Sequence, residues 1–223
     1  MRDLIAQERF ELELLDKLNS GGTLRYLVFT GGTMLRLCFG LERFSVDLDF
    51  WIWKRADHQK LFDKLQEVFS RSYILKDCAD KFYTLIFELK SKDYPRSLKV
   101  EIRKSAPKGI KTEQAIAYSK YSDLQVLVRV VSLADMMRLK IDAFLERGEI
   151  RDVYDMEFLF KRGIGLGVSR DKLRNLLEKI DGLTRRDYTV KLGSLLEESQ
   201  RQYYMRENFK LLKAAIKERL IEG

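Results

Sequence analysis

The sequence has few of the residues on which disulfide-stabilised and zinc-binding proteins depend. Its 223 residues include two cysteines, two prolines and one histidine. Cys38 and Cys78 do not have the spacing of metal ligands, so we expect both to be small buried side chains in a reducing compartment. His58 has no second histidine with which to bind zinc. The composition thus excludes a disulfide scaffold and a histidine-rich zinc site.

Long apolar segments are also absent. No uncharged apolar run approaches the roughly 20 residues that a transmembrane helix needs. The first four residues, 1–4, include charged side chains and no continuous apolar core, so we expect neither a secretory signal nor a membrane partner, and a cytoplasmic location. Hydrophobic residues make up 45% and charged residues 34% of the chain, which is typical of a globular domain.

Positive charge exceeds negative charge along the chain. There are 42 lysine and arginine residues against 34 aspartate and glutamate residues, which gives a net charge of +8. Such an excess favours a polyanionic partner, with nucleic acid as the first choice. An acidic protein partner would explain the charge equally well.

Residues 26–53 contain the most informative pattern. A short apolar run ends at Gly31-Gly32, an apolar segment follows, and a second apolar strand contains Asp47 and Asp49. This order predicts a strand, a glycine turn, a short helix, a loop and a second strand. Adjacent glycines allow close approach of the backbone to a ligand, and the free N–H groups of a helix start favour phosphate.

Asp47 and Asp49 are two residues apart on the second predicted strand, so both side chains point to one face. Because the strand is otherwise apolar, unpaired carboxylates on it would be costly unless a cation lies between them. Hard oxygen ligands of this kind suit magnesium. A diglycine before a helix and an acidic strand face are each common alone, but together they indicate nucleotidyl transfer.

The motif Gly31-Gly32-Thr33 followed by Arg43-x-Ser45-x-Asp47-x-Asp49-Phe50 resembles the AbiEii/AbiGii toxin family of nucleotidyltransferases, within the DNA polymerase β-like superfamily. The resemblance extends over about 26–156. It implies Mg²⁺ or Mn²⁺ at Asp47 and Asp49, and a nucleoside triphosphate substrate. The residues that it places at the nucleotide are Gly31, Gly32, Thr33, Arg43, Ser45 and Lys140.

The resemblance also points to Glu101 as the third metal ligand and a catalytic residue, because superfamily members take this carboxylate from a later strand of the same sheet. Residues 97–103 alternate strictly between apolar and charged, which predicts such a strand. The alternative is that Lys99, Glu101 and Arg103 form an ordinary charged outer face. The basic loop over 103–111 either meets the phosphates of RNA or nucleotide, or is a solvated loop.

Lys140 falls within the apolar stripe of a helix predicted to begin after Ser132. A lysine there either extends outward to solvent or reaches substrate phosphates, and the resemblance implies the catalytic role. Asp152 and Asp155 match the family's Arg-Asp-x-x-Asp pattern, and we favour Asp152 as the catalytic contributor. Alternatively, Asp152 caps its helix and Arg151 pairs with Asp155 on the surface.

The expected fold is α/β (α+β): a nucleotidyltransferase-like mixed sheet with flanking helices over 1–162, then a helical bundle over 163–223. Helices are expected over 4–19, after an N-cap at Asp57, and then over 169–180, 184–198 and 200–221. Further strands are expected at 73–75, 82–89, 97–103 and 125–131.

The function that the resemblance implies is a magnesium-dependent nucleotidyltransferase, the toxin of a type IV toxin–antitoxin or phage-defence pair. It would transfer a nucleotide from a nucleoside triphosphate to RNA, with the tRNA 3′ end as acceptor, and a separately encoded antitoxin would counter it. Two alternatives stay open. One is a non-catalytic nucleotide-binding regulatory or interaction module, and the other is a nucleotidyltransferase with a small-molecule acceptor.

Overall fold

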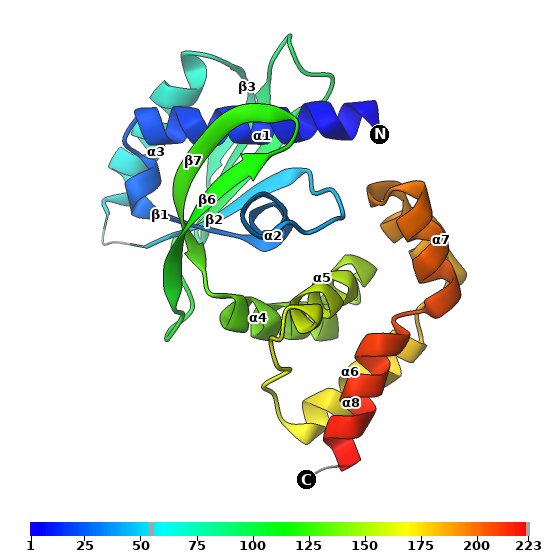
Figure 1. The fold of residues 1–223 in the computed structure, drawn as a ribbon. Coiled ribbons are helices and arrows are strands. Elements are labelled where there is room, and N and C mark those ends of the chain that lie inside the picture. Colours follow the sequence, from blue (N-terminus) through cyan, green and yellow to red (C-terminus); the bar gives the residue numbers. More distant parts are fainter. Residues whose placement is uncertain (54–55, 222–223) are drawn as a thin grey trace. The chain divides into compact units, whose positions relative to one another are not determined.

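The computed structural model describes residues 1–53 and 56–221. The chain divides into two compact units, Met1–Ser132 and Leu133–Gly223, each of which is treated by itself (Figure 1). The first contains the sheet, and the second is helical. The sequence-based boundary between 162 and 163 lies later, so the helices that follow the sheet pack with the second unit.

The first unit is built on a mixed sheet, which confirms the predicted fold class. Over the described residues the sheet has seven strands in the order β3-β4-β5-β2-β1-β7-β6. The strand β2 runs parallel to β5, β1 runs parallel to β7, and the other neighbours are antiparallel. The bounds are β1 Leu27–Thr30, β2 Asp47–Ile52, β3 Ile74–Asp80, β4 Thr84–Lys90, β5 Leu98–Arg103, β6 Thr112–Ser119 and β7 Ser122–Val131.

The α-helices described alongside this sheet are α1 Arg2–Ser20, α2 Gly31–Phe39 and α3 His58–Ser70. The helix α1 packs against β5, β6, β7 and α3 (Figure 1). The ring of Phe87 on β4 contacts Phe62 and Phe69 of α3, so this face of the sheet is buried. Asp57 accepts a hydrogen bond from the backbone N–H of Lys60, which confirms the predicted N-cap of α3.

Buried polar contacts position the loop between α2 and β2. The guanidinium of Arg36 on α2 pairs with Glu8 of α1, donates to the carbonyls of Leu41 and Glu42, and lies 3.9 Å from the ring centre of Phe44. The amide of Gln7 donates to the carbonyl of Val46 at 3.2 Å. These contacts determine where the chain enters β2, and so where its carboxylates lie.

The strand β6 was not predicted from the sequence. It lies at the edge of the sheet and pairs only with β7, so it needs no continuous apolar face. Its polar start and its small residues Ala115 and Ala117 give a weak alternating pattern. The strand expected over 82–89 begins at Thr84 instead, which leaves Phe82 and Tyr83 in the turn between β3 and β4.

The second unit contains α4 Leu133–Arg147, α5 Ile150–Lys161, α6 Arg170–Asp181, α7 Glu198–Glu207 and α8 Lys210–Ile221. Ser169 caps α6 as predicted. The single helix expected over 200–221 is wrong, because Asn208 and Phe209 adopt left-handed conformations with φ of 49° and 54° and separate α7 from α8. The segment expected to be helical over 184–198 is a π-helical turn, Asp187–Leu192, followed by a short 3₁₀ turn. None of the helices in the described ranges is both long and apolar enough to cross a membrane.

Candidate active site

Three carboxylates share one face of the sheet. Asp47 and Asp49 lie on β2, and Asp49 is the register partner of Glu101 on the parallel strand β5 and of Thr30 on β1. Residues directly opposite one another in paired strands point to the same face. The opposite face carries Leu48 and other buried apolar side chains. The prediction that Asp47 and Asp49 point to the same face of their strand therefore agrees with the structure.

The diglycine packs directly against the acidic strand. Gly31 has a φ of +80°, and a Cβ atom placed on it would overlap Oδ2 of Asp49. A Cβ on Gly32 would overlap the guanidinium of Arg43 and lie 3.0 Å from Oγ of Ser45. The two halves of the motif are thus interlocked, because only glycine leaves room for the carboxylate and the guanidinium beside the start of α2.

We expect Gly31→Ala to lower the free energy of unfolding of the first unit by about 2–4 kcal/mol, since it combines an unfavourable positive φ with overpacking against Asp49. Gly109→Ala is the matched control, with a φ of +77° and no atom within 4 Å of the added Cβ. It should cost only the backbone part, about 1–2 kcal/mol. Urea denaturation followed by tryptophan fluorescence measures both, and equal losses would show that the overlap with Asp49 is relieved without cost.

Thr33 and Arg43 are buried beneath this corner. The hydroxyl of Thr33 donates to the backbone carbonyl of Asp47 at 2.6 Å, and Nη1 of Arg43 donates to the carbonyl of Phe44 at 3.0 Å. These contacts favour a positioning role for both side chains. Ser45 is half-buried beside Gly32. Direct nucleotide contact by these residues stays a prediction.

Lys99 is the cation nearest in register to the three acids. Its ammonium donates to Oε2 of Glu101 at 3.0 Å, and Lys99 is the register partner of Asp47. The hydrogen bond to Glu101 raises the pKa of Lys99; partial burial opposes the shift, and the negative charges of Glu101, Asp47 and Asp49 add to it. Within residues 1–53 and 56–221, no three acidic, histidine or cysteine side chains are arranged closely enough to hold a metal ion. In this structure Glu101 is bonded to Lys99 instead.

An open pocket of about 250 Å³ lies beside Asp47. Its lining combines acidic, basic and apolar side chains: Val46, Asp47, Asp77, Ile86, Glu88, Arg96, Ser97 and Lys99. Sequence reasoning did not find Arg96, and it considered Lys99 only as part of a charged outer face. The alternation of 97–103 was the available signal for Lys99, because it places the lysine on the same face as Glu101.

Glu11 is an acidic side chain that sequence reasoning also missed. It is fully buried on α1, and neither of its carboxyl oxygens has a hydrogen-bond partner in the described structure. Burial, followed by the negative charge of Glu8, raises the pKa of Glu11 well above its usual value of 4.5, and the charge of Asp47 acts in the same direction. Within an amphipathic helix of alternating charges, nothing local marks this glutamate as buried.

We expect Glu11→Gln to stabilise the first unit at pH 8 relative to the wild type. The unfolded chain releases this proton near pH 4.5, whereas the folded chain retains it. Wild-type stability therefore falls as the pH rises from 4.5 towards the folded-state pKa, by at most about 1.4 kcal/mol per pH unit. The variant lacks this dependence, so its advantage should vanish towards pH 4.5. Urea midpoints from pH 4.5 to pH 8 test this, with exposed Glu113→Gln as control; parallel pH profiles would contradict it.

Lys140 and Asp152 form a buried ion cluster in the second unit. The ammonium of Lys140 lies 3.1 Å from Asp152 and 2.6 Å from Asp155, and Arg147 also pairs with Asp152 at 2.8 Å. Both aspartates are fully buried and Lys140 is nearly so. Of the alternatives left open by the sequence, an outward-reaching Lys140 and a surface position for Asp155 are therefore wrong. Asp152 is not the cap either, because Glu149 precedes the first residue of α5.

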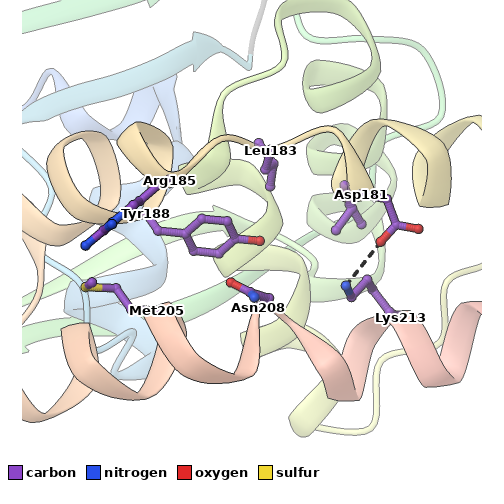
Figure 2. Close-up of a pocket in the computed structure, with 8 residues that line it drawn as sticks. Asp181, Leu183, Arg185, Tyr188, Met205, Asn208 and Lys213 are labelled. Carbon is purple, nitrogen blue, oxygen red and sulfur yellow. Dashed lines mark hydrogen bonds and ion pairs between the residues drawn. The ribbon is translucent and has the colours of Figure 1, made fainter.

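A second pocket, of about 470 Å³, lies within the helical unit (Figure 2). Its lining residues come from the end of α6, the segment that follows it, the π-helical turn, and α7, α8 and their junction: Ile180, Asp181, Leu183, Arg185, Tyr188, Met205, Asn208 and Lys213. Lys213 pairs with Asp181 at 3.1 Å, and the side chains of Tyr188 and Asn208 line the same pocket. None of the residues predicted from the sequence lines this pocket.

Two solved structures from Helicobacter pylori are similar to this chain. The protein JHP933 aligns with a TM-score of 0.59 and 21% identity, covering 96% of this chain and 94% of its own. A presumed nucleotidyltransferase from the same organism aligns with a TM-score of 0.58 and 21% identity, covering 94% and 96%. At this identity the likeness shows the fold alone. The curated proteins include no match to this chain.

The family comparison covers nearly the whole chain. The profile of the AbiEii family, described as the nucleotidyl transferase AbiEii toxin of type IV toxin–antitoxin systems, matches residues 13–219. The match includes the diglycine, the three carboxylates and the cluster around Lys140. The chain therefore belongs to the AbiEii family of nucleotidyltransferase toxins.

Proposed function

We propose that this chain transfers a nucleotide from a nucleoside triphosphate to the 3′ end of an RNA, with tRNA as the acceptor, in a Mg²⁺- or Mn²⁺-dependent reaction. The observation that carries the proposal is the packing of Gly31 against Asp49, with Asp47 and Glu101 on the same face of the sheet. Phosphate oxygens at the start of α2 would then lie beside the carboxylates that have to control charge during the transfer.

The residues fit a divalent metal by their chemistry. Three hard carboxylate oxygen donors on adjacent strands are the ligands that Mg²⁺ prefers, and one of them, Glu101, now accepts a hydrogen bond from the ammonium of Lys99. Asp47, Asp49 and Glu101 would hold the ion once Glu101 leaves Lys99. A bound divalent ion would supply charge neutralisation for the phosphates and a lowered pKa for the attacking hydroxyl.

The remaining residues have supporting roles in this proposal. The backbone N–H groups at Gly31 and Gly32 bind phosphate oxygens, and Thr33 keeps Asp47 in register through its carbonyl. Arg43 and Ser45 maintain the corner that the nucleotide meets. The resemblance assigns catalysis to Lys140 and Asp152. The ammonium of Lys140 forms ion pairs with Asp152 and Asp155, so we propose that these two aspartates orient the lysine side chain.

An RNA acceptor is supported by charge. The chain has a net charge of +8, and the loop after β5 contains Lys104, Lys108 and Lys111 within the same unit as the carboxylates. Membership of a type IV toxin family also implies a separately encoded antitoxin as a partner.

The proposal is tested by incubating the pure protein with Mg²⁺, each labelled nucleoside triphosphate in turn, and total tRNA. We expect label in RNA of tRNA size with at least one nucleotide, and its loss when EDTA removes the metal. Nucleotide binding without transfer to any acceptor would contradict the proposal and indicate a non-catalytic nucleotide-binding module. Label in a small molecule, and none in RNA, would contradict the RNA acceptor and indicate a small-molecule acceptor instead.

A further inference from the structure

Two adjacent aromatic side chains are almost fully exposed in the turn between β3 and β4. Phe82 is 82% exposed and Tyr83 is 75% exposed, and their rings lie edge to face with centres 4.5 Å apart. Other phenylalanines of this unit, such as Phe10 and Phe87, are completely buried. Two large apolar surfaces in water are unfavourable unless a partner covers them.

Basic residues lie on both sides of this aromatic turn, although the ammonium of Lys104 pairs with Asp80 at 2.5 Å. Lys81 precedes it, and Arg103 at the end of β5 is the register partner of Thr84, the first residue after it. The backbone N–H of Lys104 donates to the carbonyl of Tyr83 at 2.9 Å, so the basic loop over 104–111 begins beside the rings. Aromatic surface and positive charge are therefore combined at one end of the sheet.

The aromatic turn leads into β4, which pairs with β5, the strand that carries Glu101. Ile86 of β4 is the register partner of Glu101, and Thr84, the first residue of β4, is the register partner of Arg103. Glu101 therefore lies two residues along the sheet from the start of β4, where the turn ends. At roughly 3.3 Å per residue, the turn is on the order of 10 Å from Glu101 along the strand. A short single strand can span this distance.

We propose that Phe82, Tyr83 and the surrounding cations form a platform for the single-stranded end of the RNA acceptor. Unpaired bases stack on exposed aromatic rings, whereas lysine and arginine side chains bind the phosphates between them. Bases inside a duplex are already stacked, so the platform selects an unpaired end. This inference rests on the proposed RNA acceptor and specifies the surface that holds it.

The binding test uses the full-length protein without nucleotide and with EDTA present, so that binding is separate from transfer. The probe is a fluorescein-labelled single-stranded RNA of about 10 nucleotides, measured by fluorescence anisotropy at fixed salt. Phe82→Ala/Tyr83→Ala should weaken binding at least about tenfold. Phe82→Trp/Tyr83→Trp keeps the stacking surface and should bind within about twofold to threefold of the wild type.

The matched control is Ile116→Ala/Leu127→Ala. These side chains are 50% and 56% exposed and are register partners on β6 and β7. These two strands lie at the edge of the sheet opposite to β3 and β4. The control removes two exposed apolar side chains without touching the platform, so its RNA affinity should equal that of the wild type. Equal affinities for all variants, or an equal loss in the control, would overturn the inference.

The contribution of charge has its own readout. Arg103→Gln should weaken binding and reduce the slope of log K against log salt by about 0.7, the change expected for one lost phosphate contact on a single strand. A blunt RNA duplex should bind more weakly than the single strand, and the aromatic variants should bind it as the wild type does. An unchanged salt slope would show that Arg103 does not contact an RNA phosphate and is not part of the platform.

The outcomes separate this inference from the proposed function. RNA binding that depends on Phe82 and Tyr83, without any transfer, supports the platform and contradicts the proposed reaction. Transfer to tRNA with a KM for tRNA that is unchanged in the Phe82→Ala/Tyr83→Ala variant supports the reaction and contradicts the platform.

Discussion

Replacement of Asp49 with asparagine is expected to lower the rate of nucleotide transfer by about 1,000-fold or more, which corresponds to about 4 kcal/mol of transition-state stabilisation. Asp49 contacts the diglycine corner and is the register partner of Glu101, so it lies where the triphosphate and the metal would meet. The amide keeps the shape of the carboxylate but removes its charge, and so weakens metal binding. Initial rates of label incorporation at several Mg²⁺ concentrations measure the loss.

The fold should survive this change, because it removes one of three like charges on a shared face. The thermal unfolding temperature of Asp49→Asn should therefore equal or exceed that of the wild type. Asp123→Asn is the control, since it neutralises an exposed aspartate on β7 of the same sheet. A transfer rate for Asp49→Asn within about threefold of the control would refute the catalytic assignment.

We expect Lys140→Met to destabilise the second unit by about 3–5 kcal/mol. The substitution leaves Asp152 and Asp155 fully buried with one cation fewer, and an uncompensated buried carboxylate is costly. Trp51 and Trp53 are the only tryptophans and lie in the first unit, so tryptophan fluorescence follows that unit. Far-UV circular dichroism follows the helices as well. The circular dichroism transition should move to lower urea, whereas the fluorescence transition should stay in place.

Two further variants complete this test. Lys172→Met removes an exposed ion pair with Asp142 of 2.6 Å and should change stability by less than about 1 kcal/mol. Lys140→Met/Asp155→Asn removes the uncompensated charge and should recover much of the loss. Transfer assays at a temperature where Lys140→Met remains folded separate the two roles of the lysine. A normal rate would contradict the catalytic role, and stability equal to that of the wild type would contradict the structural one.

Local sequence patterns were sufficient to predict many of the elements. The apolar periodicity of 4–19 predicted α1, the caps at Asp57 and Ser169 marked the starts of α3 and α6, and strict alternation over 97–103 predicted β5. The position of Asp47 and Asp49 on one face followed from the two-residue period of a strand. Each of these signals lies within a few residues of the element that it predicts.

Other features depended on partners that are distant in the sequence. The edge strand β6 is held by β7, and the break at Asn208 and Phe209 follows from packing in the helical unit, where the ring of Phe209 is buried against Tyr188 and Tyr204. The alternating pattern of β6 is weak, and the only local signal for the break is a single asparagine, Asn208. Sequence reasoning therefore predicted no strand over 112–119 and one continuous helix where there are two.

By itself the sequence determined the chemical groups of the site, because a glycine pair and alternating carboxylates have fixed local consequences for backbone and side-chain direction. The tertiary structure decided what surrounds them. It placed β5 beside β2, so that Glu101 lies opposite Asp49, and it buried Glu11 without a hydrogen-bond partner in the described residues. Strand order and burial arise from packing between segments far apart in the chain, and short-range periodicity contains no information about them.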